Sequence, residues 1–333
     1  MKNLYKLKYI FITILSVSLM SSCQTESSFE DELPSIANIA VSNANFSTLE
    51  AAAVAGGVAG VLSNSNPNDA SGAYTVFAPT NDAFARLGLN ENTLGVLQKS
   101  FLTNTLLYHV SNGNLAGNTI SGGGSSTSAL SLDRRFIERG DDTYINGSKI
   151  LATDITASNG TVHVIDKVMI ASGADIVQTA IALQSANVFT SPELTYLVEA
   201  VLYAELADAL TASEGSPSFT VFAPTDQAFI DLGAALGLTF TSPADIRQLP
   251  KETVQQVLLN HVIANDGKFT SELSAGTVTP LGGDDLTLGA FTNGTLTVTG
   301  AGNGGEVANM GIPDVQTTNG IVHVIDRVLL PNL

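Results

Sequence analysis

Two segments of the chain place apolar residues at helical spacing. Residues 46–62 (FSTLEAAAVAGGVAGVL) and 194–210 (LTYLVEAVLYAELADAL) repeat apolar side chains about every three to four positions, which predicts helices that bury one face. A shorter apolar pair, TLLYHV at 105–110 and VLLNHV at 257–262, follows in the same order. The chain therefore uses one helical pattern twice.

A second repeated pattern passes from strand to helix. AYTVFAPTNDAF at 73–84 returns as SFTVFAPTDQAF at 218–229. Strand-forming residues come first, and Pro79 cannot continue a sheet ladder. Thr80 suits the N-cap of a following helix, and Phe84 supplies an apolar anchor. The second copy offers the same residue types, Pro224, Thr225, Asp226 and Phe229. This corner needs no chemistry to explain it.

The last repeated segment alternates apolar and polar residues. ASNGTVHVIDKVMI at 157–170 matches TTNGIVHVIDRVLL at 317–330. Asn159-Gly160 and Asn319-Gly320 are favoured residues of a hairpin turn. In the first copy, period two predicts a strand from the turn to Ile170, with alternate residues on opposite faces. One face carries Val162, Val164, Asp166, Val168 and Ile170, and the other carries His163, Ile165 and Lys167.

The repeated segments keep one order, so the chain is a tandem duplication with its boundary near Ala171–Gly173. YTVFAPTNDAF, LLYHV and NGTVHVID resemble the signature segments of the fasciclin domain family. The resemblance covers residues 34–172 and 173–333. It implies an α+β fold, in which each domain is a wedge or sandwich of β-strands packed with several α-helices. It also implies a role in extracellular adhesion.

The N-terminus has the pattern of a secretory signal. Lysines precede a short apolar run that ends at Cys23, the only cysteine of the chain. We expect a signal peptide at 1–22, a lipidated Cys23 and an acidic flexible tether at 23–33. The alternative is an ordinary secreted protein with an incidental cysteine. Lipidation predicts attachment to a bacterial membrane, which we expect to be the outer membrane. The protein would then face the periplasm or the cell surface.

Net charge narrows the choice of partner. The chain carries 14 Lys+Arg against 31 Asp+Glu, a formal charge of −17. This excess argues against binding nucleic acid and against electrostatic docking on anionic lipid.

The chemistry-bearing residues predict no enzyme. All four histidines (His109, His163, His261 and His323) lie in the repeated motifs, without zinc spacing, and no phosphate loop or nucleophile elbow occurs. We interpret the histidines as structural groups that hydrogen-bond loop backbone. The sequence predicts no catalytic residue, no metal and no cofactor.

Candidate binding residues come from the resemblance. In animal members of the family, a Tyr-His pair and an Asp-Ile pair have been linked to integrin recognition. Leu107-Tyr108-His109 corresponds to the first, although domain 2 has Asn260 in place of the tyrosine. Asp154-Ile155 corresponds to the second, and Asp314-Val315 is a near match. The alternative is that these residues pack the domains. We also note Arg139-Gly140-Asp141 between two strand-like runs, where Gly-Asp is typical of a turn.

Two functional classes remain open. The first is a non-catalytic, lipid-anchored protein that mediates adhesion through a protein or matrix partner. The second is a surface lipoprotein that binds a glycan or small molecule. Carbohydrate platforms need exposed aromatic faces, and the absence of tryptophan weakens the glycan reading.

Overall fold

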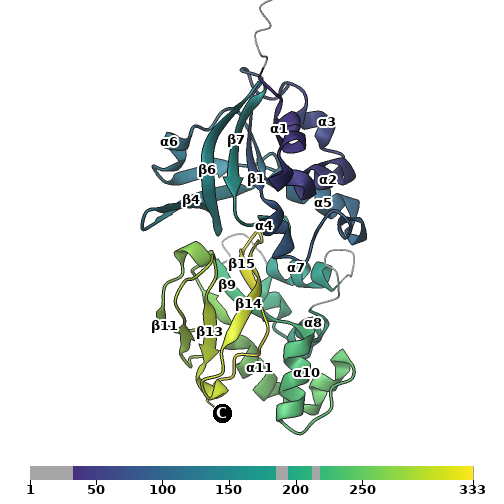
Figure 1. The fold of residues 1–333 in the computed structure, drawn as a ribbon. Coiled ribbons are helices and arrows are strands. Elements are labelled where there is room, and N and C mark those ends of the chain that lie inside the picture. Colours follow the sequence, from purple (N-terminus) through teal and green to yellow (C-terminus); the bar gives the residue numbers. More distant parts are fainter. Residues whose placement is uncertain (1–32, 185–193, 212–217, 333) are drawn as a thin grey trace, which may run out of the picture. The chain divides into compact units, whose positions relative to one another are not determined.

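The structure is a computed structural model that describes residues 33–184, 194–211 and 218–332. The predicted signal peptide and Cys23 lie outside these residues. The described chain forms two α+β domains, as the resemblance implies (Figure 1). We call residues 33–172 domain 1 and residues 173–332 domain 2.

Domain 1 is a mixed sheet with helices packed against it. Its strands pair in the order β2-β1-β7-β6-β5-β4-β3, and β1 and β7 run parallel. The strands are β1 (Tyr74–Pro79), β2 (Val110–Asn112), β3 (Gly124–Thr127), β4 (Asp133–Arg139), β5 (Asp142–Ile145), β6 (Ser148–Ala157) and β7 (Gly160–Ile165). The helices are α1 (Ile36–Ser42), α2 (Ser47–Gly56), α3 (Ala59–Leu62), α4 (Asn81–Ala85), α5 (Lys99–Tyr108) and α6 (Gly117–Ile120).

Domain 2 repeats this order. Its sheet runs β10-β9-β15-β14-β13-β12-β11, and β9 and β15 run parallel as β1 and β7 do in domain 1. The strands are β9 (Phe219–Pro224), β10 (Val262–Ala264), β11 (Gly276–Val278), β12 (Leu286–Leu288), β13 (Thr297–Gly300), β14 (Ala308–Gln316) and β15 (Gly320–Ile325). The helices are α7 (Ile176–Leu183), α8 (Thr195–Tyr203), α9 (Ala207–Leu210), α10 (Asp226–Ala235) and α11 (Lys251–Leu259).

The repeated corner forms as the sequence predicts. Strand β1 ends at Pro79, and the Thr80 hydroxyl accepts a hydrogen bond from the N–H of Ala83 at 3.3 Å. Thr225 caps α10 in the same way, through Ala228 at 3.3 Å. The ring of Phe84 is buried in the core of domain 1. Local capping chemistry and one apolar anchor therefore build the same turn twice.

Three sequence predictions need correction. Each long helical pattern is two helices, because the chain turns into the left-handed region at Gly57 and at Glu205. The predicted strand to Ile170 ends at Ile165, so residues beyond it do not alternate across one sheet. Gly160 is the first residue of β7 rather than a turn residue. A Cβ there would lie 2.0 Å from the Tyr74 carbonyl oxygen, so only glycine fits.

The segment after β7 joins the two domains. Strand β8 (Ile170–Ala171) adds to the sheet of domain 2, where Ile170 pairs with Val315 and Ala171 pairs with Gln316. Ile170 packs in the core of domain 2, whereas Met169 and Ala171 pack in a cluster of domain 1. A two-residue strand therefore belongs to both domains.

Candidate functional site

The Tyr-His motif lies at the end of α5, and its side chains are buried. Tyr108 is 0% exposed and His109 is 2% exposed, while Leu107 is partly buried. The Tyr108 hydroxyl donates to Oε1 of Gln316 and accepts from Nδ2 of Asn146 at 2.7 Å. Burial raises the pKa of Tyr108. This geometry favours the packing alternative for Tyr108 over a role in contacting a partner.

The four histidines hydrogen-bond the backbone, as the sequence predicts. Nδ1 of His109 donates to the Thr105 carbonyl at 2.7 Å, and its Nε2 accepts from the Met169 N–H at 3.0 Å. His261 makes the same pair of bonds in domain 2. Burial lowers the pKa of each of these two rings to about 4. Both rings are therefore neutral near pH 7, with one nitrogen donating and one accepting.

Tyr108 and Asn260 are both buried, so the difference between them concerns how the two cores are packed. In domain 1 the buried Arg134 on β4 donates to the Tyr108 carbonyl at 2.6 Å, and its guanidinium lies 5.1 Å from the centre of the Phe77 ring. In domain 2 the matching strand position, judged by the register of β12 with β11, is Leu286. Tyrosine with arginine in one copy thus corresponds to asparagine with leucine in the other.

Asp154 and Ile155 lie in β6 at an irregularity of its pairing with β7. Asp154 has a φ of +61°, a conformation that Asp and Asn tolerate. Its N–H donates to Nδ1 of His163 at 3.2 Å, and its Oδ1 accepts from the N–H of Gly117 at 2.8 Å. Asp154 is exposed and Ile155 is half-buried. Of the predicted binding residues, Asp154 is the one whose side chain is open to solvent.

Asp314 and Val315 occupy the matching bulge of β14 in domain 2 but are covered. Oδ2 of Asp314 lies 2.6 Å from Nζ of Lys167, and both side chains are about nine-tenths buried. Burial acts to raise the pKa of Asp314, but the charge of Lys167, the neighbouring His323 and the hydrogen bonds from Lys167 and Thr270 together hold the pKa below its usual value. Val315 is 1% exposed and pairs with β8. Lys167 of domain 1 therefore covers Asp314 of domain 2, whereas Asp154 at the matching position of domain 1 is exposed.

Lys167 and Gln316 are key residues that sequence reasoning missed. Lys167 also donates to the Gly294 carbonyl at 2.7 Å, and Nε2 of Gln316 donates to the Asp133 carbonyl at 3.0 Å. The periodic strand predicted through residue 167 hid the role of the lysine. Its apolar flanks, Val168 and Met169, were the one available signal that the cation is buried.

Arg139 of the Arg-Gly-Asp tripeptide is held by domain 2. Its Nη1 donates to the carbonyls of Ser271 and Leu273 at 2.8 and 2.6 Å, and its guanidinium lies 4.1 Å from the centre of the Phe291 ring. Gly140 forms the predicted turn between β4 and β5 with a φ of +62°. The guanidinium is thus engaged within the molecule.

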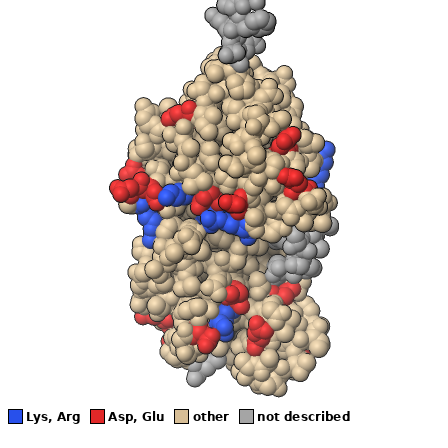
Figure 2. Space-filling view, viewed as in Figure 1, with Lys and Arg blue, Asp and Glu red and all other residues tan. Residues whose placement is uncertain are grey.

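Basic side chains of domain 1 recur at this junction. Arg135 forms an ion pair with Glu272 at 2.8 Å, and Arg86 donates to the Asn293 carbonyl at 2.8 Å. On the face shown in Figure 2, basic side chains gather in a band across the middle with acidic side chains beside them, and most of the remaining surface is uncharged. Arg86, Arg135, Arg139 and Lys167 of domain 1 thus all make polar contacts with domain 2.

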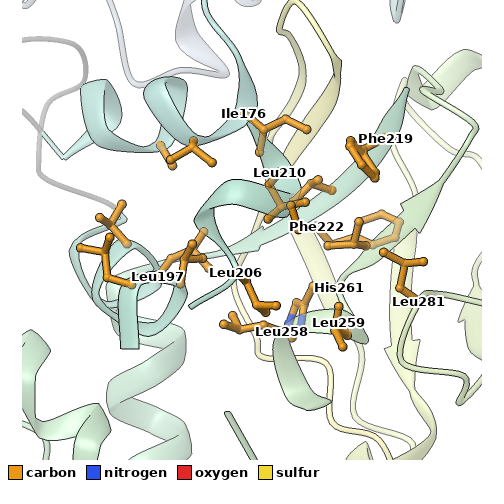
Figure 3. Close-up of a pocket in the computed structure, with 18 of the residues that line it drawn as sticks. Ile176, Leu197, Leu206, Leu210, Phe219, Phe222, Leu258, Leu259, His261 and Leu281 are labelled. Carbon is orange, nitrogen blue, oxygen red and sulfur yellow. The ribbon is translucent and has the colours of Figure 1, made fainter. Parts of the chain in front are cut away.

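Each domain also has an apolar pocket beneath its helices. In domain 2 a cavity of about 290 Å³ is lined by α7, α8, α9, α11 and β9 (Figure 3). Its lining is almost wholly aliphatic and aromatic, and the ring of His261 is its main polar group. The matching pocket of domain 1 is smaller, about 180 Å³, and includes His109. Both ring nitrogens of each histidine already form hydrogen bonds within the protein. The pockets therefore suit a neutral, apolar ligand.

Within the described ranges, no three His, Cys, Asp or Glu side chains are grouped to hold a metal ion. Among the same residues, none of the helices has the length and apolar character needed to cross a membrane.

Comparisons with known proteins agree with the duplication. The model of the Fasciclin domain family matches residues 44–171 and 192–331. Protein sll1483 of Synechocystis sp. is 38% identical over 143 residues, which cover 42% of this chain and 75% of that protein. Human periostin is 27% identical over 296 residues, covering 83% of this chain. Because the match covers 32% of periostin, this chain spans about a third of that protein's length.

One solved structure is also similar, a FAS1 domain pair from the insect cell adhesion molecule Fasciclin I. It is 18% identical with a TM-score of 0.38, and the match covers 78% of this chain and 88% of that one.

Proposed function

Because the chain belongs to the fasciclin domain family, we propose that it is a non-catalytic cell-envelope protein that mediates adhesion or matrix contact through a protein partner. In this proposal, a lipidated Cys23 anchors the protein to a bacterial membrane, namely the outer membrane. The protein then faces the periplasm or the cell surface. The cysteine lies outside the described residues, and the proposal rests on its place after the apolar run. Detergent phase partitioning tests it, since Cys23→Ser should move the protein into the aqueous phase.

One observation supports a protein partner at domain 1. Asp154 is exposed at a bulge of β6 whose counterpart in β14, at Asp314, makes a contact between the two domains. Because Asp154 has the same backbone geometry as Asp314 but is exposed, it is suited to a contact of the same kind with another protein. Asp154 and Ile155 are therefore the residues that we propose for binding, with Asp314 and Val315 serving the internal junction.

The test compares two exposed aspartates of domain 1 in the full chain. Asp154→Asn keeps an oxygen that accepts from Gly117 and suits the positive φ, so it removes charge without disturbing the loop. We expect it to weaken adhesion to cells or matrix about tenfold, the effect of losing about 1.4 kcal/mol at a contact. Asp141→Asn, in the Arg-Gly-Asp turn, should leave adhesion unchanged. Equal adhesion of wild type and Asp154→Asn would contradict the assignment.

The pocket of domain 2 supports a second candidate, binding of a small neutral apolar molecule. An engineered cavity of about 150 Å³ takes up benzene, so a cavity of about 290 Å³ has room for a larger hydrocarbon. Its lining offers apolar contact and little hydrogen bonding. The chemistry disfavours glycans, which need polar partners as well as aromatic faces.

A fluorescent probe can test this pocket. N-phenyl-1-naphthylamine, which brightens in apolar surroundings, should bind the full chain saturably. Ala180→Phe, on the pocket wall of α7, should abolish the signal by filling the space. Gln178→Phe adds the same ring on the exposed side of that helix and should have no effect. The same signal from all three proteins would rule this pocket out as the binding site.

A further inference from the structure

The two aspartate bulges, at Asp154 in β6 and at Asp314 in β14, are built alike. Asp154 and Asp314 both have a positive φ, +61° and +67°, and both follow matching irregularities in their strand pairing. Each N–H donates to Nδ1 of a buried histidine at 3.2 Å. Each Oδ1 accepts a backbone N–H, from Gly117 at 2.8 Å or from Thr270 at 2.6 Å. The contacts made at Asp314 can therefore be used as a template for what could bind at Asp154.

In domain 2 the template is occupied by a segment of domain 1. Oδ2 of Asp314 receives Nζ of Lys167, as described above. Three residues later the segment becomes extended, and Ile170 and Ala171 pair in parallel with Val315 and Gln316. The N–H of Ser172 then donates to the Gln316 carbonyl at 3.0 Å. The bound segment thus consists of a cation, two spacer residues and a short added strand.

In domain 1 the same position is open among the described residues. The pairing of β6 with β5 stops at Lys149, so the edge from Asp154 to Thr156 has β7 on one side only. Asp154 and Thr156 are exposed, and Ile155 is half-buried. Within the part of the chain that the structure describes, Asp154 and the adjoining strand edge therefore have no segment bound to them.

We propose that the β6 edge at Asp154–Thr156 takes up an extended segment of a partner protein as an added parallel strand. Asp154 binds a Lys or Arg of that segment, and an aliphatic residue three positions later lies beside Ile155. Added strands give affinity through main-chain hydrogen bonds, and side-chain sites such as Asp154 give specificity. This inference rests on the proposed function and specifies the chemistry of the partner at the same site.

The chain's own segments match this pattern poorly. The N–H groups of Ser158 and Thr318 donate to the carbonyls of Pro34 and Ala174 respectively, so the residues ahead of Pro34 correspond to those ahead of Ala174. The residue that corresponds to Lys167 is Ser27, and Glu30, Asp31 and Glu32 follow it. Residues 24–32 contain four acidic residues and no Lys or Arg, so this stretch of sequence offers no cation for Asp154, which favours a basic segment from another protein.

The C-terminal counterpart of the segment is already engaged in its own domain. Arg327 stands where Lys167 does and forms an ion pair with Glu306 at 3.3 Å. Leu330 donates its N–H to Asn303 at 2.8 Å, and its carbonyl accepts from Gly302 at 2.8 Å. A second copy of this chain would have to release these contacts before it could dock.

A peptide carries the test. The probe is a fluorescent peptide with the sequence of residues 166–172, DKVMIAS, titrated into the full chain, whose Asp314 site is already filled. We expect saturable binding at high micromolar to millimolar peptide, and about tenfold weaker binding by Asp154→Asn. A peptide that carries the substitution Lys167→Gln should bind equally weakly to the wild-type protein and to Asp154→Asn. The Asp141→Asn protein should bind the original peptide like wild type. Hydrogen exchange at the amide of Thr156, the counterpart of Gln316, should slow when the peptide binds.

Three outcomes would overturn the inference. They are no saturable binding at millimolar peptide, equal binding by wild type and Asp154→Asn, and binding that appears only after residues 24–31 are deleted. The last result would assign the edge to the chain's own tether. Adhesion measured on the same variants separates the two proposals. Loss of adhesion in Asp154→Asn without peptide binding leaves the proposed function standing, whereas peptide binding without an effect on adhesion leaves only the inference.

Discussion

Asp314→Ala should lower the free energy of unfolding by about 3–5 kcal/mol, because it leaves the buried ammonium of Lys167 without its counter-charge. Guanidinium chloride unfolding of the full chain, followed by circular dichroism, measures the loss. The junction should weaken as well as domain 2, so we expect the transition to broaden or split into two.

The duplication supplies a matched control for this experiment. Asp154→Ala removes the same side chain from the same backbone geometry, with a similar positive φ, and no lysine of the described residues is bound there. The difference between the two variants therefore reports the ion pair together with the hydrogen bond that Oδ2 of Asp314 accepts from the Thr270 hydroxyl at 2.7 Å. Lys167→Met combined with Asp314→Asn should recover much of the loss, since it removes both buried charges and keeps a residue that tolerates the positive φ. Equal losses in Asp314→Ala and Asp154→Ala would show that the ion pair adds no stability.

Phe229→Ala should also cost about 3–5 kcal/mol, because it opens a cavity in the core of domain 2. The ring is 2% exposed and stacks on Tyr196 with 6.0 Å between ring centres. Phe84→Ala, at the same position of domain 1, should have a similar effect, since that ring is 2% exposed too. Thermal and denaturant unfolding of the full chain would measure both.

Thr225→Ala serves as the comparison for Phe229→Ala. It removes the cap of the same helix and should cost only about 1 kcal/mol. A phenylalanine variant no less stable than its cap variant would show that the ring is not an anchor of the core.

The parts of the fold that sequence could predict are local. The cap at Thr80 and the strand before Pro79 depend on residues within a few positions, so their pattern is readable in one stretch. The end of β7 is different, because residues beyond Ile165 leave the sheet to cross into the next domain. Alternation alone cannot indicate which sheet a residue will join.

The candidate site shows the same limit. An apolar-flanked tyrosine on a helix has one sequence pattern whether it faces solvent or core. The burial of Tyr108 is decided by Asn146 and Gln316, which are distant in sequence. Asp154 and Asp314 could be matched from the repeat, but only the fold reveals that Lys167 covers one and not the other.

The strand shared by the two domains affects how the protein is made. Synthesis runs from the N-terminus, so β8 leaves the ribosome before β14, its partner in the sheet, has been translated. Until then the side chain of Ile170 and the charge of Lys167 have no binding site in domain 2. A fragment cut between Ser172 and Gly173 would keep domain 1 in this half-finished state. It would also release a domain 2 with a bare strand edge at Val315, the kind of surface that pairs with other chains and aggregates.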